Sequence, residues 1–317
     1  MKKQAVLTLR LNNWRDARIL ADELHGWTFR GQQDATWALS TTLQRAALSP
    51  GSSIMLTGAE EQMIEQFQRR AHHFLPDSPP LDNLIDWMAL IQHYGGTTRL
   101  LDFTKSFYVA TFFAIEKATS ECAVWCIDHY ALYLALKRYL DLPEHTFWPH
   151  WQTLHLTARF VQENLKIEKR KGFCLERFVF EVQPFKLNER LVVQQGVFLC
   201  PLSVDIPFVE SLAATFGLSS TDFDNSEIQD FNLEGRLRDF LEDTVAIKIL
   251  LPIAIHHDVL QDLWDMNVNA ASLFPGLDGL ARSLNYHLRI EHLWQVKYNA
   301  GGFADFVAGK KKAEDNS

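Results

Sequence analysis

The sequence predicts an α+β protein, with a single compact domain in which a mixed or antiparallel sheet system is surrounded by helices. Two observations support this prediction. Six short apolar runs, bounded by turn signals, are too short for helices and indicate strands. Between them lie longer stretches with apolar residues at helical spacing.

The composition limits the function classes. The chain has 317 residues, 47% of them hydrophobic, which is enough for a sizeable core. A formal net charge of −8 argues against a broad non-specific nucleic-acid surface. The four cysteines form no CxxC pair, so we expect no metal, and we interpret Cys122 and Cys126 as buried thiols. No run is long enough to span a bilayer and no signal peptide is recognisable, so we expect a cytoplasmic protein without membrane contact.

The first elements are predicted from caps and periodicity. Asn13 precedes a helix with apolar residues on one side, and a strand over residues 27–30 follows. Residues 60–75 have the spacing of an amphipathic helix, and Asp82 is a candidate cap for the next one.

The stretch 92–114 is central, because a helix end, a strand over 98–103 and a new helix start meet there. Its polar residues are Gln92, His93, Arg99, Asp102, Thr104 and Ser106. Charges inside apolar runs need partners, so we expect Arg99 and Asp102 to be buried and paired with residues of 29–32 or 92–94. The six residues together favour a site. A structural ion pair with a helix cap at Ser106 is the alternative.

The second half supplies the remaining strands of the same sheet, predicted over 122–127, 176–182, 192–200 and 245–251. Residues 130–171 are predicted as a helical insertion, residues 256–266 as a helix, and Pro275 as a first helical residue. No linker divides the chain, so one domain over 1–307 and a disordered tail over 308–317 are expected.

A series of motifs runs through the chain in a fixed order. They are Phe29-Arg30-Gly31-Gln32 with Trp37 and Arg45, Gln92-His93-Tyr94-Gly95, Thr98 to Thr104, Arg190, Gln195-Gly196, and Leu273-Phe274-Pro275. The series resembles the FRG domain family, named for its Phe-Arg-Gly motif, over residues 27–284. That family is mainly bacterial and phage-associated, and the resemblance implies a fold unit more than a function.

A second, partial resemblance is to ADP-ribosyltransferases. Arg30-Gly31 is similar to their first-strand motif, and Thr104 and Ser106 with the following helix are similar to their second. The resemblance implies NAD as cofactor, with Arg30 on its diphosphate and the hydroxyls on the nicotinamide ribose. The third motif, a strand glutamate, is missing, because Gln194 and Gln195 stand there and supply no negative charge.

These resemblances define the expected site. The catalytic candidates are Arg30, Thr104, Ser106 and Gln195, and the ligand-binding candidates are Gln32, His93, Tyr94, Arg99 and Asp102. Arg30, His93, Tyr94, Thr104, Ser106 and Gln195 are expected to converge on one cleft.

Two functions remain open. One is an NAD-dependent enzyme of the ADP-ribosyltransferase or glycohydrolase type. The other is a non-catalytic module that binds a nucleotide, another phosphorylated small molecule or a protein target. A hydrolase using His93 and Asp102 ranks last, because no HExxH or GxSxG pattern occurs.

Overall fold

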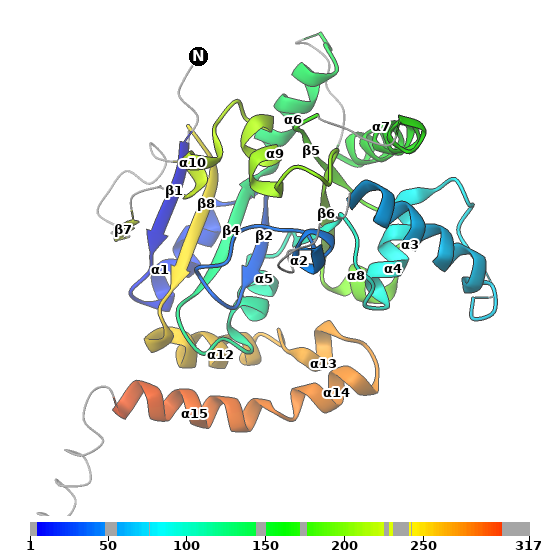
Figure 1. Cartoon of the computed structure of the whole chain (residues 1–317). Helices are drawn as coiled ribbons and strands as arrows, with labels where there is room; N and C mark the ends of the chain where they lie inside the picture. The colour runs from blue at the N-terminus through cyan, green and yellow to red at the C-terminus, as the bar shows by residue number, and fades with distance from the viewer. Residues whose placement is uncertain are drawn as a thin grey trace, which may run out of the picture.

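An eight-stranded mixed sheet forms the centre of the computed structural model, which describes residues 5–47, 56–75, 77–143, 150–171, 176–224, 228–230, 241 and 243–299 (Figure 1). In spatial order the strands are β5 (Val179–Val182), β6 (Gly196–Pro201), β3 (Leu101–Thr104), β2 (Trp27–Gln32), β4 (Cys122–Asp128), β8 (Thr244–Leu251), β1 (Ala5–Arg10) and β7 (Ile228–Asp230). Antiparallel ladders join the strands from β5 to β8, and β1 pairs in parallel with both β8 and β7.

Helices fill most of the chain between the strands. In chain order they are α1 (Trp14–Glu23), α2 (Thr42–Ala47), α3 (Leu56–Ala71), α4 (Leu84–His93), α5 (Phe107–Ile115), α6 (His129–Tyr139), α7 (His150–Lys171), α8 (Glu189–Val193), α9 (Phe208–Thr215), α10 (Ser220–Asp224), the 3-10 helix η1 (Ile253–Ile255), α12 (His256–Asp265), α13 (Ala270–Leu273), α14 (Leu277–Ser283) and α15 (Tyr286–Asn299). The predicted α+β class is therefore confirmed.

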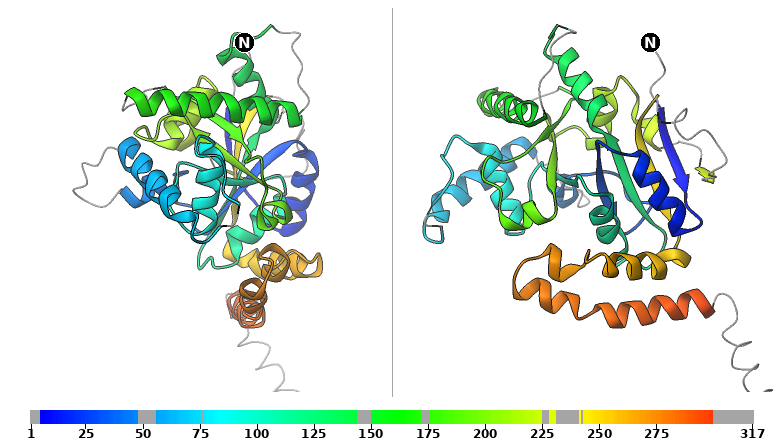
Figure 2. Two further views of the ribbon diagram at one scale, coloured as in Figure 1. Left: turned by 90° about the vertical axis from the view of Figure 1, so that its right-hand side faces the viewer. Right: turned by 180° about the vertical axis from the view of Figure 1, so that it is seen from behind.

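Both faces of the sheet are covered. Helices α1, α5 and α12 pack on one face of the strands from β1 to β2, and α6, α9 and α10 pack on the opposite face. Helices α3, α4 and α7 pack around the β5 and β6 end. Helices α12 to α15 form a layer across one end of the strands (Figure 2). This double coverage explains why β4 and β8 consist of almost continuous apolar residues.

Helix α5 lies directly against the backbone of β2. Alternation along β2 turns Trp27, Phe29 and Gly31 toward α5. A Cβ atom on Gly31 would lie 2.0 Å from the carbonyl oxygen of Ala110 and 2.5 Å from the backbone nitrogen of Ala114. Only glycine therefore fits at the end of the Phe-Arg-Gly motif, for a packing reason.

The six predicted strands all belong to the one sheet, with shifts at their ends. β3 begins at Leu101 and β5 at Val179, later than predicted. The prediction of a strand over 192–200 is wrong for its first residues, because Val192 and Val193 belong to helix α8. Asn188 caps that helix by accepting a 2.8 Å bond from the Leu191 nitrogen. Strands β1 and β7 were not predicted.

The predicted caps are mostly correct. Asn13 accepts a bond of 2.9 Å from the Asp16 nitrogen, and Ser106 accepts one of 3.3 Å from the Val109 nitrogen. The cap of α4 is Asn83 rather than Asp82, since the Asn83 side chain bonds to the first turn.

The prediction for Pro275 is wrong. Gly276, at φ 111°, is the residue that precedes α14, so Pro275 lies in the turn between α13 and α14. A positive φ of this size suits glycine because it has no Cβ.

The predicted domain over 1–307 includes residues that the structure does not describe, so this boundary stays a prediction. The predicted tail over 308–317 lies wholly outside the described residues. Within the segment 130–171 the structure describes two helices, α6 and α7, residues 144–149 lie outside the described part, and the interpretation of the segment as an insertion stays a prediction. Over the described part of the chain, no helix combines the length and apolar character that crossing a membrane requires.

Candidate ligand-binding cleft

The sheet forks between β2 and β3. These strands pair at one position, Phe29 with Thr104, whereas β3 pairs with β6 along its whole length. Beyond Phe29 no further backbone pairing joins the two strands. A side chain links them instead, because Arg30 Nη1 donates to the main-chain oxygen of Asp102 at 2.7 Å. The Phe-Arg-Gly motif therefore places its arginine inside the fork.

A cleft of about 560 Å³ opens over this fork, a volume in the range of small-molecule sites. Its walls come from β2, α2, α4, β3, α5, α8 and β6, together with the segment that follows β2. Five of the nine predicted site residues line it, namely Arg30, Gln32, His93, Asp102 and Thr104.

The other four predicted residues lie outside the lining. Tyr94 follows α4 with 64% of its surface exposed, and its ring forms a T-shaped pair with the His93 ring. Ser106 is the cap of α5. Gln195 is exposed at φ 49°, and the neighbouring Gln194 lines the cleft instead. The expected convergence of six residues on one cleft therefore holds for three: Arg30, His93 and Thr104.

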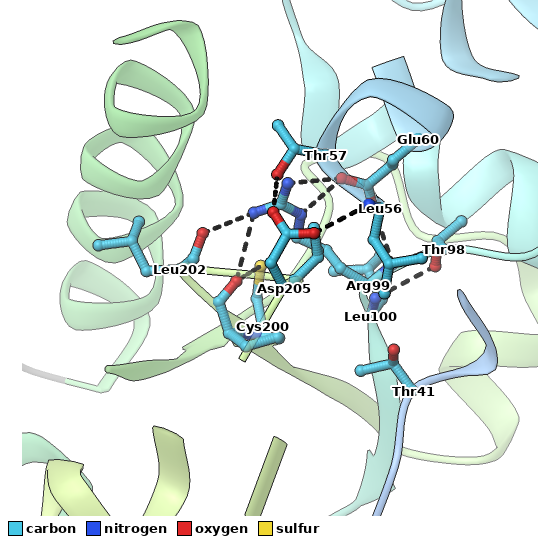
Figure 3. Close-up of polar contacts among 12 residues, drawn as sticks. Thr41, Leu56, Thr57, Glu60, Thr98, Arg99, Leu100, Cys200, Leu202 and Asp205 are labelled. Carbon is cyan, nitrogen blue, oxygen red and sulfur yellow. Dashed lines mark hydrogen bonds and ion pairs between the residues drawn. The ribbon is translucent and has the colours of Figure 1, made fainter. Parts of the chain in front are cut away.

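Arg99 is the fourth predicted site residue that lies outside the cleft lining, and it belongs to a buried structural ion pair (Figure 3). The residue is 2% exposed, so it is buried as predicted, and its Nε donates to Glu60 Oε2 at 2.7 Å. Its Nη1 donates to the Leu202 oxygen at 2.7 Å. The predicted partner segments are wrong, since Glu60 lies on α3. Arg99 joins α3 to the entry of β3 and the end of β6.

Asp102 was predicted to be buried, and this is wrong. Its side chain is 60% exposed, because it alternates with the buried Leu101 and Phe103 and so points to the open side of β3. The predicted partner segments are correct. Gln92 Nε2 donates to Asp102 Oδ1 at 2.7 Å, and Arg30 Nη1 lies 3.9 Å from Oδ2.

Three arginines give the cleft its charge. Arg30, Arg45 and Arg190 all line it, and Asp102 is the one carboxylate among the described lining residues. Burial lowers the pKa of Arg30 to about 10, against the opposing effect of Asp102, so the guanidinium stays charged at neutral pH. Arg30 Nε is buried and has no hydrogen-bond partner within the described residues. A buried unpaired donor costs free energy and calls for a ligand or an ordered water.

Arg190 is held by stacking. Its guanidinium carbon lies 4.4 Å from the centre of the Phe274 ring, which also faces Arg282 at 4.1 Å. Burial and the charge of Arg190 lower the pKa of the nearby His93, so that imidazole is neutral at pH 7. Arg45 Nη1 donates to the Ser40 oxygen.

Thr104 and Gln32 are held by the protein itself. The Thr104 hydroxyl donates to the Gln194 oxygen at 2.6 Å and accepts from the Ser106 nitrogen at 3.0 Å. Gln32 donates to the Ala38 oxygen and accepts a bond from Trp125. Both therefore shape the walls of the cleft.

The sequence prediction missed the aromatic and basic parts of the lining. Trp37, 52% exposed, and Phe113 supply ring surfaces to the cleft. Trp37, Arg45 and Arg190 all occurred in the motifs quoted above, which was the available signal. Two glutamates lie on or near the strands β5 and β6, and neither supplies the missing strand glutamate: Glu181 pairs with His129 at 2.6 Å, and neither it nor Glu189 lines the cleft.

Comparison with known families gives one match. Residues 25–122 match the family model of the FRG domain. This stretch contains β2, α2, α3, α4, β3 and α5, and therefore most walls of the cleft, whereas α8 and β6 lie beyond it. No curated protein and no solved structure matches the chain.

Proposed function

We propose that the FRG domain of this chain binds a phosphorylated nucleotide of the NAD type in the cleft over the β2–β3 fork. One observation carries the proposal: three guanidinium groups and one carboxylate line the same cleft as the exposed ring of Trp37 and the partly buried ring of Phe113. A guanidinium offers a planar set of donors that matches phosphate oxygens, and an aromatic ring offers a stacking surface for a base.

Arg30 is the expected primary phosphate contact. It lies in the fork, its Nη1 is already oriented by the Asp102 oxygen, and its buried Nε lacks a partner within the described residues. A phosphate oxygen that accepts from Nε would satisfy this donor. Trp37 is the expected platform for the base, because it combines exposure with a place in the lining.

The ribose contacts we propose differ from those first expected. Thr104 already makes two hydrogen bonds, and Ser106 is engaged as a helix cap. The neutral imidazole of His93 can donate one hydrogen bond and accept another, so it is the better candidate for a ribose hydroxyl.

Catalysis is the second candidate function, and Asp102 is the observation that favours it. Cleavage of NAD at the nicotinamide ribose requires a carboxylate that stabilises the developing positive charge. Asp102 is the one carboxylate in the described lining. It replaces the strand glutamate of ADP-ribosyltransferases only in charge, since it lies on β3 rather than β6. We therefore propose binding as the main function and glycohydrolase chemistry as the alternative.

The experiment is a calorimetric titration of the full chain with NAD and with ADP-ribose. We expect binding that Arg30→Ala abolishes, and that Arg30→Lys weakens strongly because lysine lacks the planar donor set. The melting temperature checks that each variant is folded. Arg177→Ala is the matched control, because Arg177 is an exposed arginine outside the cleft.

Release of nicotinamide separates the two functions. Release by the wild type that disappears in Arg30→Ala would establish an enzyme, and binding without release would establish a module. If neither NAD nor ADP-ribose binds, nucleotide recognition is refuted and recognition of a protein target is favoured.

A further inference from the structure

The carboxylate of Asp102 acts on all three arginines of the cleft. Its carboxylate lies 3.9 Å from Arg30, and its charge also acts on Arg45 and Arg190, opposing the effect of burial on the pKa of each. One carboxylate therefore acts electrostatically on three guanidinium groups from β2, α2 and α8, and among the described residues it lies within ion-pair distance of Arg30.

The shared carboxylate leaves the cleft with excess positive charge. Three guanidinium groups and one carboxylate, with His93 neutral, amount to two uncompensated positive charges among the described lining residues. Guanidinium groups removed from water need counter-charges, so this excess favours an anion of charge near −2.

Asp102 is also held loosely for a residue in such a setting. Its distance of 3.9 Å to Arg30 contrasts with 2.6 Å between Arg99 and Glu60 in the buried pair. Its one short side-chain bond within the described residues comes from Gln92, and 60% of the side chain is exposed. Rotation of this side chain toward solvent would remove the carboxylate from Arg30 at little cost in packing, while the bond from Arg30 to the Asp102 main-chain oxygen stays.

We infer that Asp102 is an internal counter-ion of the cleft, which a ligand with two or more negative charges displaces from the three arginines. This inference rests on the proposed function and specifies its ligand class, a diphosphate or another polyanionic phosphate. An uncharged nucleoside lacks the charge that competes with Asp102, so it would not bind by this route.

The test removes the charge of Asp102. Asp102→Asn and Asp102→Ser are titrated with ADP-ribose, inorganic pyrophosphate and adenosine, beside the wild type. The control is Asp77→Asn, which changes the net charge equally at an exposed position outside the cleft. Loss of a nearby repulsive charge predicts binding of ADP-ribose and pyrophosphate about tenfold tighter in both Asp102 variants. The control should bind like the wild type, and the gain should shrink in high salt.

The outcomes distinguish this inference from the proposed function. Weaker or unchanged polyanion binding in both Asp102 variants, with normal melting temperatures and normal binding by the control, overturns the counter-ion role and leaves nucleotide binding intact. Adenosine that binds as tightly as ADP-ribose also overturns it. If neither the wild type nor any variant binds a phosphorylated probe, the proposed function fails and the inference fails with it.

Discussion

At the scale of single residues, each residue of the Phe-Arg-Gly motif has a different physical role in the structure. Phe29 packs against Phe107 in the core, with ring centres 5.7 Å apart. Arg30 bridges the fork of the sheet. Gly31 allows the backbone of α5 to approach β2. Two of the three positions therefore serve packing, and one faces the cleft.

The packing role of Gly31 can be tested by adding one methyl group at this position. Gly31→Ala places a Cβ against two backbone atoms of α5, which cannot move independently, so we expect a loss of at least about 2 kcal/mol in unfolding free energy. The matched control is Gly58→Ala in α3, where a Cβ meets nothing within 4 Å. This change should stabilise by about 0.5–1 kcal/mol. Urea unfolding of both variants measures the difference, and similar stability of the two would refute the packing argument.

A buried histidine makes a separate prediction about pH. His256 Nε2 donates to the Leu251 oxygen at 2.9 Å and lies 3.3 Å from the Cys122 sulfur. Burial, with a smaller contribution from Arg289, lowers its pKa from 6.5 to about 4. The unfolded chain therefore takes up a proton near pH 6.5 that the folded protein binds only near pH 4.

Stability from His256 is accordingly complete above pH 6.5, falls as the pH drops through the window from 6.5 to 4, and is constant below it. The total change is about 3 kcal/mol. His256→Gln should lose less stability between pH 7 and pH 4.5 than the wild type, measured by urea unfolding at both values. Equal losses in the two proteins would show that other groups dominate.

At the scale of elements, ion pairs connect segments that no local pattern joins. The Arg99–Glu60 pair is 3% and 4% exposed in its side chains and links α3 to the sheet. Its partner choice depends on how α3 packs, so the sequence could indicate that Arg99 needs a carboxylate but not which one. Asp102 was mispredicted for a related reason, because its exposure depends on the cleft above it.

Breaking this pair should be costly. Glu60→Ala leaves the Arg99 guanidinium buried without its carboxylate, so we expect a loss of about 3–5 kcal/mol. The control is Asp77→Ala, which removes one partner of the exposed Lys186 pair and should cost less than about 1 kcal/mol. Thermal and urea unfolding measure both. A small cost at Glu60 would mean that water or another group replaces it.

Strand prediction succeeded where apolar runs had turn signals on both sides, as at β4 and β8. It failed at α8, where Val192 and Val193 suggest a strand but the Asn188 cap favours a helical turn with both valines exposed. It also missed β1, which pairs in parallel with β8 from the far end of the chain. Such long-range pairing leaves no local signal beyond a short apolar run.

At the scale of the whole molecule, the cleft depends on residues far from the matched family segment. Its lining includes Asn188, Arg190 and Phe198, all outside residues 25–122. Arg190 in turn stacks on Phe274, whose ring also meets Phe113 of α5. The C-terminal part of the chain therefore positions one of the three arginines. The sequence indicated this only through the order of its motifs.

The last prediction concerns residues 25–122 produced alone. This fragment ends at Cys122, the first residue of β4, so β2 would lose the partner strand that covers all six of its residues. β3 would lose β6, its partner over its full length, and Arg99 would lose its bond to the Leu202 oxygen. Unpaired strand edges and an exposed apolar helix α5 cannot be stabilised by local contacts.

We therefore expect residues 25–122 to show no cooperative urea transition and to bind no ADP-ribose, whereas residues 1–299 unfold cooperatively. Circular dichroism during urea titration measures the first property, and calorimetry measures the second. A cooperative transition in the short fragment would show that the matched segment is an independent folding unit. The sheet would then be assembled from a preformed FRG unit and later strands, contrary to the shared ladders that join β2 to β4 and β3 to β6.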